Sequence, residues 1–143
     1  MEDVHYYKTT IRWDEGRIGT LSSPTLDSFK VATPPEFPKG VSNIWSPEHL
    51  YVASINICLM TTFVAVAENS KLEIESFSCE ATGKLEKVDG KFMISEVELK
   101  PTIKIKFEKD RERAERIINK AENLCLISNS VKSKIVLNSQ IIN

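Results

Sequence analysis

A long apolar segment at residues 46–69 constrains the fold of this chain more than any other feature. It begins with Ser46-Pro47-Glu48, in which the serine can cap free N–H groups, the proline suits the first helical position and the acid favours the positive end of the helix dipole. We therefore predict a helix from this start to about Asn69. Its apolar residues lie on every face: Leu50, Tyr51, Val52, Ala53, Ile55, Ile57, Leu59, Met60, Phe63, Val64, Ala65, Val66 and Ala67.

A helix that is apolar on all sides is either buried on all sides or embedded in lipid. Four polar residues break the run before it reaches the ~18 residues that a membrane span requires, namely Ser54, Asn56, Thr61 and Thr62. We therefore expect no membrane insertion. A chain of 143 residues can hardly enclose such a helix alone. The sequence thus predicts a homodimer, in which a second subunit helps to cover the helix.

Three short antiparallel strands are predicted before this helix. Residues 5–13 are rich in aromatic and β-branched residues, and residues 17–22 return after a turn at Asp14-Glu15-Gly16. A third strand covers residues 28–32. Residues 33–43 are predicted to form a loop, because their three prolines and one glycine fit neither a helix nor a central strand. Long loops of this kind often cover a functional site.

The chain after the long helix predicts two more strands, a second helix and a last strand. Strands at residues 72–85 and 92–107 flank a turn at Asp89-Gly90, with a bulge or break near Ile94 to Val97, where the apolar phase switches. Apolar residues recur at helical spacing from 109 to 125. A turn at 128–130 then leads to a strand at 134–142. We predict a single domain over residues 1–143 of the α+β class.

Charge and composition exclude several classes of partner. Nineteen basic and twenty acidic residues leave a net charge of −1, which creates no field to attract nucleic acid or an anionic membrane. The acidic and aromatic start of the chain lacks the features of a secretory signal, so we expect a cytoplasmic protein. The three cysteines include no Cys-x-x-Cys pair, and only His5 and His49 accompany them. We therefore expect neither a metal site nor a disulfide scaffold.

Position alone gives no cysteine a chemical role. Cys58 lies about three turns inside the long helix, where the helix dipole lowers the pKa of a thiol little. Cys79 lies on a strand without a nearby base, and both residues fit packing positions. Cys125 continues the apolar stripe of the second helix and should point inward. By themselves Arg17 and Glu48 are likewise ordinary, as a surface arginine and a first-turn acid.

Three motifs in order change this interpretation. Residues 46–58 resemble the helix motif of the OsmC/Ohr family, the osmotically inducible protein C and organic hydroperoxide resistance proteins, in which a reactive cysteine follows ten residues after a glutamate, as Cys58 follows Glu48. Residues 125–130 resemble the family's second cysteine motif, with Leu126 where proline is frequent. Asp14-Glu15-Gly16-Arg17 looks like its arginine turn. The resemblance covers nearly the whole chain.

The resemblance implies an OsmC-like fold, with antiparallel sheets around two long central helices, in an intertwined homodimer with active sites at the interface. It also implies a thiol-dependent peroxidase of the antioxidant stress response. Cys58 would be the peroxidatic cysteine and Cys125 the resolving one. Arg17 would hold Cys58 as a thiolate, since a permanent cation lowers the pKa of a thiol, and Glu48 would orient Arg17. Arg17 and Glu48 could serve the cysteine of their own subunit or of the other.

The implied reaction needs no cofactor. Cys58 would attack a peroxide and become a sulfenic acid, Cys125 would condense with it to a disulfide, and an external dithiol, plausibly of the lipoyl type, would reduce that bond. The apolar wall of the long helix favours organic hydroperoxides over hydrogen peroxide. The alternative is a non-catalytic module that binds a small apolar or acyl-bearing ligand in the same cavity.

Overall fold

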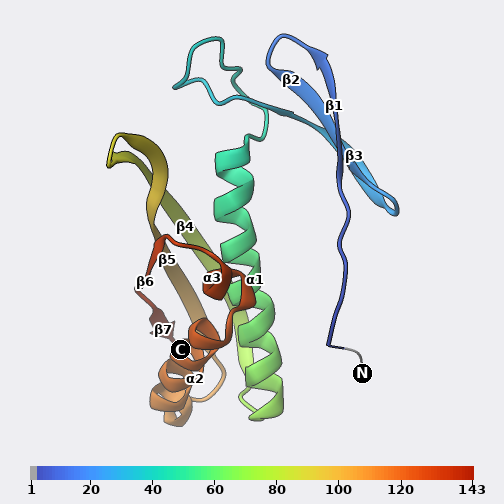
Figure 1. The fold of residues 1–143 in the computed structure, drawn as a ribbon. Coiled ribbons are helices and arrows are strands. Elements are labelled where there is room, and N and C mark those ends of the chain that lie inside the picture. The colour runs from blue at the N-terminus through green and yellow to red at the C-terminus, as the bar shows by residue number, and fades with distance from the viewer. Residues whose placement is uncertain (1–2) are drawn as a thin grey trace. The chain divides into compact units, whose positions relative to one another are not determined.

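The computed structural model describes residues 3–143 of the chain. These residues form two compact units, which divide between Leu50 and Tyr51 and are described separately. The long helix α1 (Pro47–Asn69) begins at the end of the first unit and continues as part of the second (Figure 1). Its boundaries agree with the prediction.

The first unit is an antiparallel sheet of three strands in the order β1-β2-β3. The strands are β1 (Thr10–Glu15), β2 (Ile18–Ser23) and β3 (Leu26–Ala32). All three were predicted, but the first starts at Thr10 and not at His5. The outermost register pair of β1 and β2 joins Thr10 to Ser22, and β2 ends one residue later. Residues 5–9 therefore lack a neighbouring strand in this sheet to bond with.

A tight turn of Gly16 and Arg17 joins β1 to β2. Gly16 takes φ +52°, a left-handed conformation that costs glycine little, at the position that glycine occupies in type II′ hairpin turns. The indole N–H of Trp13 donates a hydrogen bond to the Gly16 carbonyl at 3.0 Å. This turn fixes the place of Arg17 in the hairpin.

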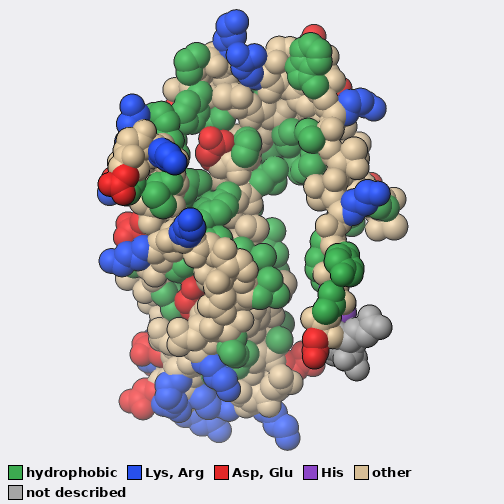
Figure 2. Space-filling view, viewed as in Figure 1, with side chains coloured by type: hydrophobic (Ala, Val, Ile, Leu, Met, Phe, Trp, Pro, Cys, Tyr) green, Lys and Arg blue, Asp and Glu red, His purple; other side chains and the backbone are tan. Residues whose placement is uncertain are grey.

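The start of α1 follows the predicted capping pattern. The Ser46 hydroxyl accepts a hydrogen bond from the His49 backbone N–H at 3.1 Å, and the Ser46 carbonyl accepts one from the Leu50 N–H at 3.0 Å. Ser46 therefore caps the helix, with Pro47 at the first helical position. Apolar side chains also reach the surface along this helix (Figure 2), in contrast to a helix buried on all sides. The exposed ones include Ile57 (57% exposed), Met60 and Val64.

The second unit contains a mixed sheet with two long antiparallel strands. These are β4 (Ile74–Val88) and β5 (Lys91–Ile105), joined by a turn in which Asp89 and Gly90 both have positive φ. The pairing shifts by one residue between Lys84 and Leu85, which face Glu96 and Ile94. Ser95 is the extra residue, so the predicted bulge is confirmed. Pro101 does not interrupt β5 and faces Cys79 on β4.

The segment after β5 agrees with the prediction in its second helix and departs from it in the turn and the strand that follow. The second helix, α2 (Arg111–Leu124), follows a short 3-10 turn, η1 (Glu108–Asp110), as expected for residues 109–125. The predicted turn at 128–130 was wrong, because these residues complete a short helix, α3 (Leu126–Ser130). The last predicted strand is two strands, β6 (Lys134–Leu137) and β7 (Gln140–Ile142).

Both of these strands pair with β5 in parallel, so the sheet is mixed and not purely antiparallel. The intervening helices supply the crossover that a parallel connection needs.

The core of the second unit lies between the helices and one face of its sheet. Buried residues alternate along β5, namely Val97, Leu99, Pro101, Ile103 and Ile105, and pack with side chains of α1 and α2. Phe63 of α1 stacks on Phe77 of β4 with ring centroids 5.3 Å apart. At Gly83 a Cβ atom would lie 2.5 Å from a Val52 methyl group. Glycine therefore allows α1 to approach β4 closely.

The length and composition of α1 also bear on a membrane role. It is the one described helix that is long and apolar enough to cross a bilayer. Core helices of soluble proteins pass the same test, so this observation does not by itself indicate a membrane span.

Candidate cysteine site

Cys58 lies in the third turn of α1, on the side of the helix that packs into the core. Only 8% of the residue is exposed, and it shares this face with Ile55, Leu59 and Phe63. The spacing of these residues places them on one side of the helix, as the positions i, i+3 and i+4 require. The thiol Sγ lies 3.9 Å from the Oγ1 atom of Thr62, one turn further along α1.

Cys125 lies between α2 and α3 and is fully buried in the same core. Burial raises the pKa of its thiol to about 12. A hydrogen bond with Thr62 lowers this pKa in part, whereas the neighbouring Cys58 thiol and the Glu122 carboxyl also raise it. Both sulfurs are reduced. The structure therefore brings the two predicted cysteines together around the Thr62 hydroxyl, and it keeps the Cys125 thiol protonated at neutral pH.

Cys79 is the third cysteine of the second unit. It is half-buried on β4, and its backbone carbonyl accepts a hydrogen bond from the Asn56 side-chain amide at 3.1 Å. Burial raises the pKa of the Cys79 thiol to about 11, with smaller contributions from Glu122 and Glu80. A thiol with this pKa is a poor nucleophile at neutral pH, since the thiolate is the reactive species.

Arg17 belongs to the first unit and is exposed on the β1–β2 turn. The Thr33 N–H donates to its backbone carbonyl at 3.4 Å, which ties the turn to the chain after β3. Of the residues that the structure describes, none forms an ion pair with the Arg17 guanidinium. The side chain that was predicted to stabilise a thiolate is thus a cation without a carboxylate partner.

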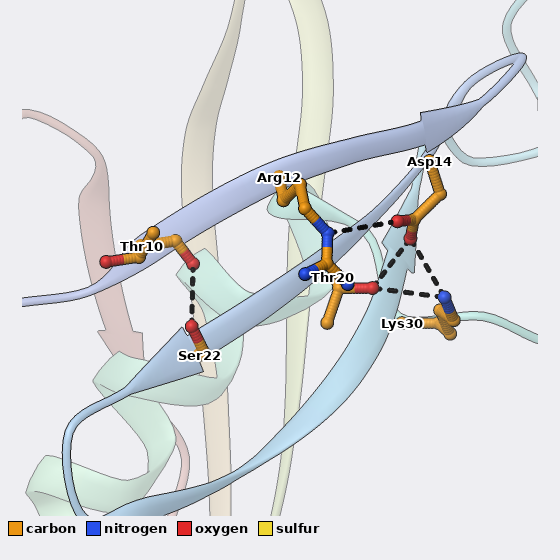
Figure 3. A network of polar contacts seen from close by, with 6 residues as sticks. All are labelled: Thr10, Arg12, Asp14, Thr20, Ser22 and Lys30. Carbon is orange, nitrogen blue, oxygen red and sulfur yellow. Dashed lines mark hydrogen bonds and ion pairs between the residues drawn. The ribbon is translucent and has the colours of Figure 1, made fainter.

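A polar network that does not include Arg17 lies on the three-stranded sheet of the first unit (Figure 3). Asp14 accepts a hydrogen bond from the Thr20 hydroxyl at 2.6 Å and one from Lys30 Nζ at 2.9 Å, and the guanidinium of Arg12 lies 3.5 Å from its other oxygen. The bonds from Thr20 and Lys30 hold the pKa of Asp14 at about 2. Asp14 therefore pairs with Arg12 and Lys30, and it forms no ion pair with Arg17.

Glu48 lies in the first turn of α1, in the first unit. Its Oε1 atom is buried, and no hydrogen bond from any residue between 3 and 143 reaches it. The neighbouring His49 is engaged, because its Nδ1 atom lies 2.6 Å from the Ser46 hydroxyl and its ring meets Trp45 edge to face. A buried carboxylate oxygen without a donor is costly. The predicted pairing of Glu48 with Arg17 does not occur within the described chain, and it stays a prediction.

Two residues of this site escaped the sequence analysis, Thr62 and Glu122. Thr62 was noted only as a polar interruption of the apolar helix, and Glu122 was not singled out. The available signal was their spacing from the cysteines. Thr62 follows Cys58 by four residues and Glu122 precedes Cys125 by three, which are the distances that bring helical side chains together. In the described part of the chain, no group of three or more His, Cys, Asp or Glu residues is arranged to hold a metal.

Residues 40–140 of the chain match the family of OsmC-like proteins. The matched stretch covers most of the chain and includes both Cys58 and Cys125. The chain is a member of the OsmC-like protein family. A relative of this OsmC-like chain is the uncharacterized protein YmaD of Bacillus subtilis strain 168, which is 25% identical over 142 residues and covers 96% of this chain and 93% of its own length.

Solved structures confirm the predicted fold. An OsmC-like protein of unknown function from Vibrio cholerae O1 matches 95% of this chain and 99% of its own, with a TM-score of 0.88 and 22% identity. An organic hydroperoxide resistance protein from Elizabethkingia anophelis matches 100% and 99%, with a TM-score of 0.79 and 24% identity. The organic hydroperoxide resistance protein OhrB of Bacillus subtilis matches 96% and 98%, with a TM-score of 0.68 and 22% identity. At these identities the likeness establishes the OsmC-like α+β fold alone.

Proposed function

We propose that this OsmC-like chain is a cytoplasmic thiol peroxidase that reduces organic hydroperoxides. The observation that carries the proposal is the meeting of two thiols in one buried apolar site, that of Cys58 on α1 and that of Cys125 between α2 and α3. A pair of thiols that can form a disulfide is what a two-cysteine peroxidase requires. The names of two fold relatives, both organic hydroperoxide resistance proteins, support the choice of substrate.

The two cysteines divide the reaction between them. Cys58, as a thiolate, attacks the terminal peroxide oxygen, and the O–O bond breaks. The departing alkoxide takes up a proton from solvent and leaves as an alcohol, and Cys58 becomes a sulfenic acid. The Cys125 sulfur then displaces the hydroxyl group as water and closes the disulfide. An external dithiol, of the lipoyl type, returns both residues to thiols. The surrounding apolar side chains favour a peroxide with an organic group.

Arg17 and Glu48 complete the proposed site, from the same subunit or from a second one. Arg17 would stabilise the Cys58 thiolate and bind the peroxide oxygens, because its guanidinium is always charged and donates several hydrogen bonds. Glu48 would hold that guanidinium through a charge-assisted pair. Two observations support this pairing: no carboxylate among residues 3–143 forms an ion pair with the Arg17 guanidinium, and no donor among them reaches the buried Glu48 oxygen.

Peroxide consumption by the native chain and by Cys58→Ser tests the function. With cumene hydroperoxide and a dithiol reductant, the native chain should consume peroxide and Cys58→Ser should lose the activity entirely. Cys79→Ser is the matched control, and it should retain activity. A native chain that consumes no peroxide with any dithiol would contradict the proposal and leave the alternative, a binding module for an apolar or acyl-bearing ligand.

The proposed homodimer has its own test. The exposed apolar side chains of α1 should lie in the subunit interface, because a contiguous apolar surface of a soluble protein marks a contact site. Analytical ultracentrifugation should find a dimer for the native chain and a monomer for Ile57→Glu, with an unchanged circular dichroism spectrum. Lys120→Glu, at an exposed position of α2, should stay dimeric. A monomeric native chain would contradict the proposal.

A further inference from the structure

Glu122 is a half-buried acid in the last turn of α2, three residues before Cys125. Its backbone carbonyl accepts a hydrogen bond from the Cys125 N–H at 3.2 Å, so the two residues are held next to each other by the end of the helix. The Oε2 atom of Glu122 is buried, and no donor among residues 3–143 reaches it within hydrogen-bond distance. No described lysine, arginine or histidine forms an ion pair with it. A carboxyl group in this state is costly for folding and calls for an explanation.

The groups around Glu122 are thiols and a hydroxyl. Burial raises the pKa of its carboxyl group, while contacts with the Ser128 hydroxyl and the Cys125 thiol lower it in part. The Glu122 charge in turn raises the pKa of the thiols of Cys125 and of Cys79 on β4. Glu122 thus lies within electrostatic reach of two cysteines and beside the one that is predicted to resolve the sulfenic acid.

Cys125 cannot perform its proposed step without losing a proton. Its thiol is fully buried, and at neutral pH almost none of it is the thiolate that attacks sulfur. The Thr62 hydroxyl can donate a hydrogen bond to the thiolate, but a hydroxyl is no base at this pH. A proton acceptor within the site is therefore needed.

We propose that Glu122 is the general base and then the general acid of the resolving step, taking the proton of Cys125 and returning it to the departing hydroxyl group. This inference rests on the proposed peroxidase function and adds a residue to its machinery. The Oε2 atom, which no donor among residues 3–143 reaches, has a free lone pair for the proton, and the carboxyl group contacts the Cys125 thiol.

The step balances without any further reactant. The Cys125 S–H bond breaks and its proton passes to the Glu122 carboxylate, while the freed electron pair forms a bond to Cys58 Sγ. The S–O bond of the Cys58 sulfenic acid breaks, and the departing hydroxide takes the proton back from Glu122 and leaves as water. The Cys125 sulfur is oxidised and the Cys58 sulfur is reduced, so the carboxylate ends as it began. A carboxyl with a raised pKa suits both transfers, because it lies closer to the working pH.

A thiol exchange assay tests Glu122 without any peroxide. One equivalent of dipyridyl disulfide is mixed with protein carrying Cys79→Ser, and pyridinethione release is followed by stopped-flow absorbance. The first equivalent reports attack by Cys58, and the second reports attack by Cys125 on the mixed disulfide. Cys125→Ser should release only the first equivalent. Glu122→Gln should leave the first phase unchanged and slow the second at pH 7 by at least about tenfold.

The pH dependence separates a proton transfer from a structural effect. In Glu122→Gln the second phase should speed up about tenfold per pH unit from 7 to 9, because solvent must then ionise Cys125, whereas the native phase should rise less steeply. Glu115→Gln, an exposed acid of the same helix, should behave as the native chain.

Each other outcome of the assay has a defined meaning. Equal second phases in the native chain and Glu122→Gln, or equal slowing of both phases, would overturn the assignment of Glu122. A native chain without a second phase would overturn both proposals, since the two cysteines would then not form a disulfide. A normal second phase together with no consumption of cumene hydroperoxide would overturn the peroxidase function alone.

Discussion

Val97, Leu99 and Ile103 of the second unit are fully buried, whereas Ile11 and Trp13 of the first unit are more than 60% exposed. The strands of the two units are similar in apolar content, so the difference lies in what covers them. Two helices cover one face of the second sheet, and the three strands of the first unit have few buried residues of their own. Large exposed apolar side chains mark a contact surface. The two cysteines therefore lie in the hydrophobic core of the second unit, whereas Arg17 lies in a unit that exposes large apolar side chains.

Truncation of one phenylalanine in each unit should give the largest difference between the units in the free energy of unfolding that is lost. Phe63→Ala removes a fully buried ring of the second unit and should lower the free energy of unfolding by about 3–5 kcal/mol. Phe29→Ala in the first unit removes a ring that is 40% exposed and should cost below about 1 kcal/mol in dilute protein. Urea unfolding of both variants measures this. Equal losses of unfolding free energy in the two variants, at every protein concentration, would contradict the difference in burial between the two units.

A substitution at the close contact between α1 and β4 should cause an intermediate loss of unfolding free energy. Gly83→Ala places a Cβ atom against the Val52 methyl group and should cost about 1–3 kcal/mol of unfolding free energy. The double variant with Val52→Ala should recover part of this loss, because the second change makes room for the first. Losses that simply add in thermal or urea unfolding would show that α1 and β4 are not in close contact at this position.

The smallest effect concerns the polar network of the first unit. A carboxyl carbon NMR titration should give Asp14 a pKa of about 2, and Thr20→Ala should raise it toward its ordinary value. Because the folded pKa lies below the unfolded value of about 3.9, any stability from this carboxylate is complete above pH ~4 and is lost as the pH falls toward about 2. An Asp14 pKa near 4 in the native chain would show that the network does not stabilise the carboxylate.

Local signals in the sequence predicted much of the fold. Ser46-Pro47-Glu48 located the start of α1, because capping and the helix dipole depend only on neighbouring residues. The change of apolar phase after Ile94 located the bulge at Ser95 for the same reason. The turn predicted at residues 128–130 was wrong, since serine and asparagine favour turns locally but here complete a short helix.

The candidate site was predictable only in part. A family motif located Cys58 and Cys125, whereas periodicity alone described both as packing residues. The sequence could not show that Thr62 and Glu122 meet them, because that depends on how α1 and the end of α2 pack in space. Helical spacing from each cysteine would have nominated both residues, although many polar side chains share such a spacing by chance.

The parallel pairing of β6 and β7 with β5 has a consequence for synthesis of the chain. During translation, β5 emerges before residues 106–133, and its second edge stays without a partner until β6 follows. At the usual speed of a ribosome this delay is on the order of seconds. An open strand edge can meanwhile capture a strand of another nascent chain, which alternating charges such as Glu98 and Lys100 on its outer face discourage. The yield of folded protein should therefore depend on how quickly β6 is synthesised and pairs with β5.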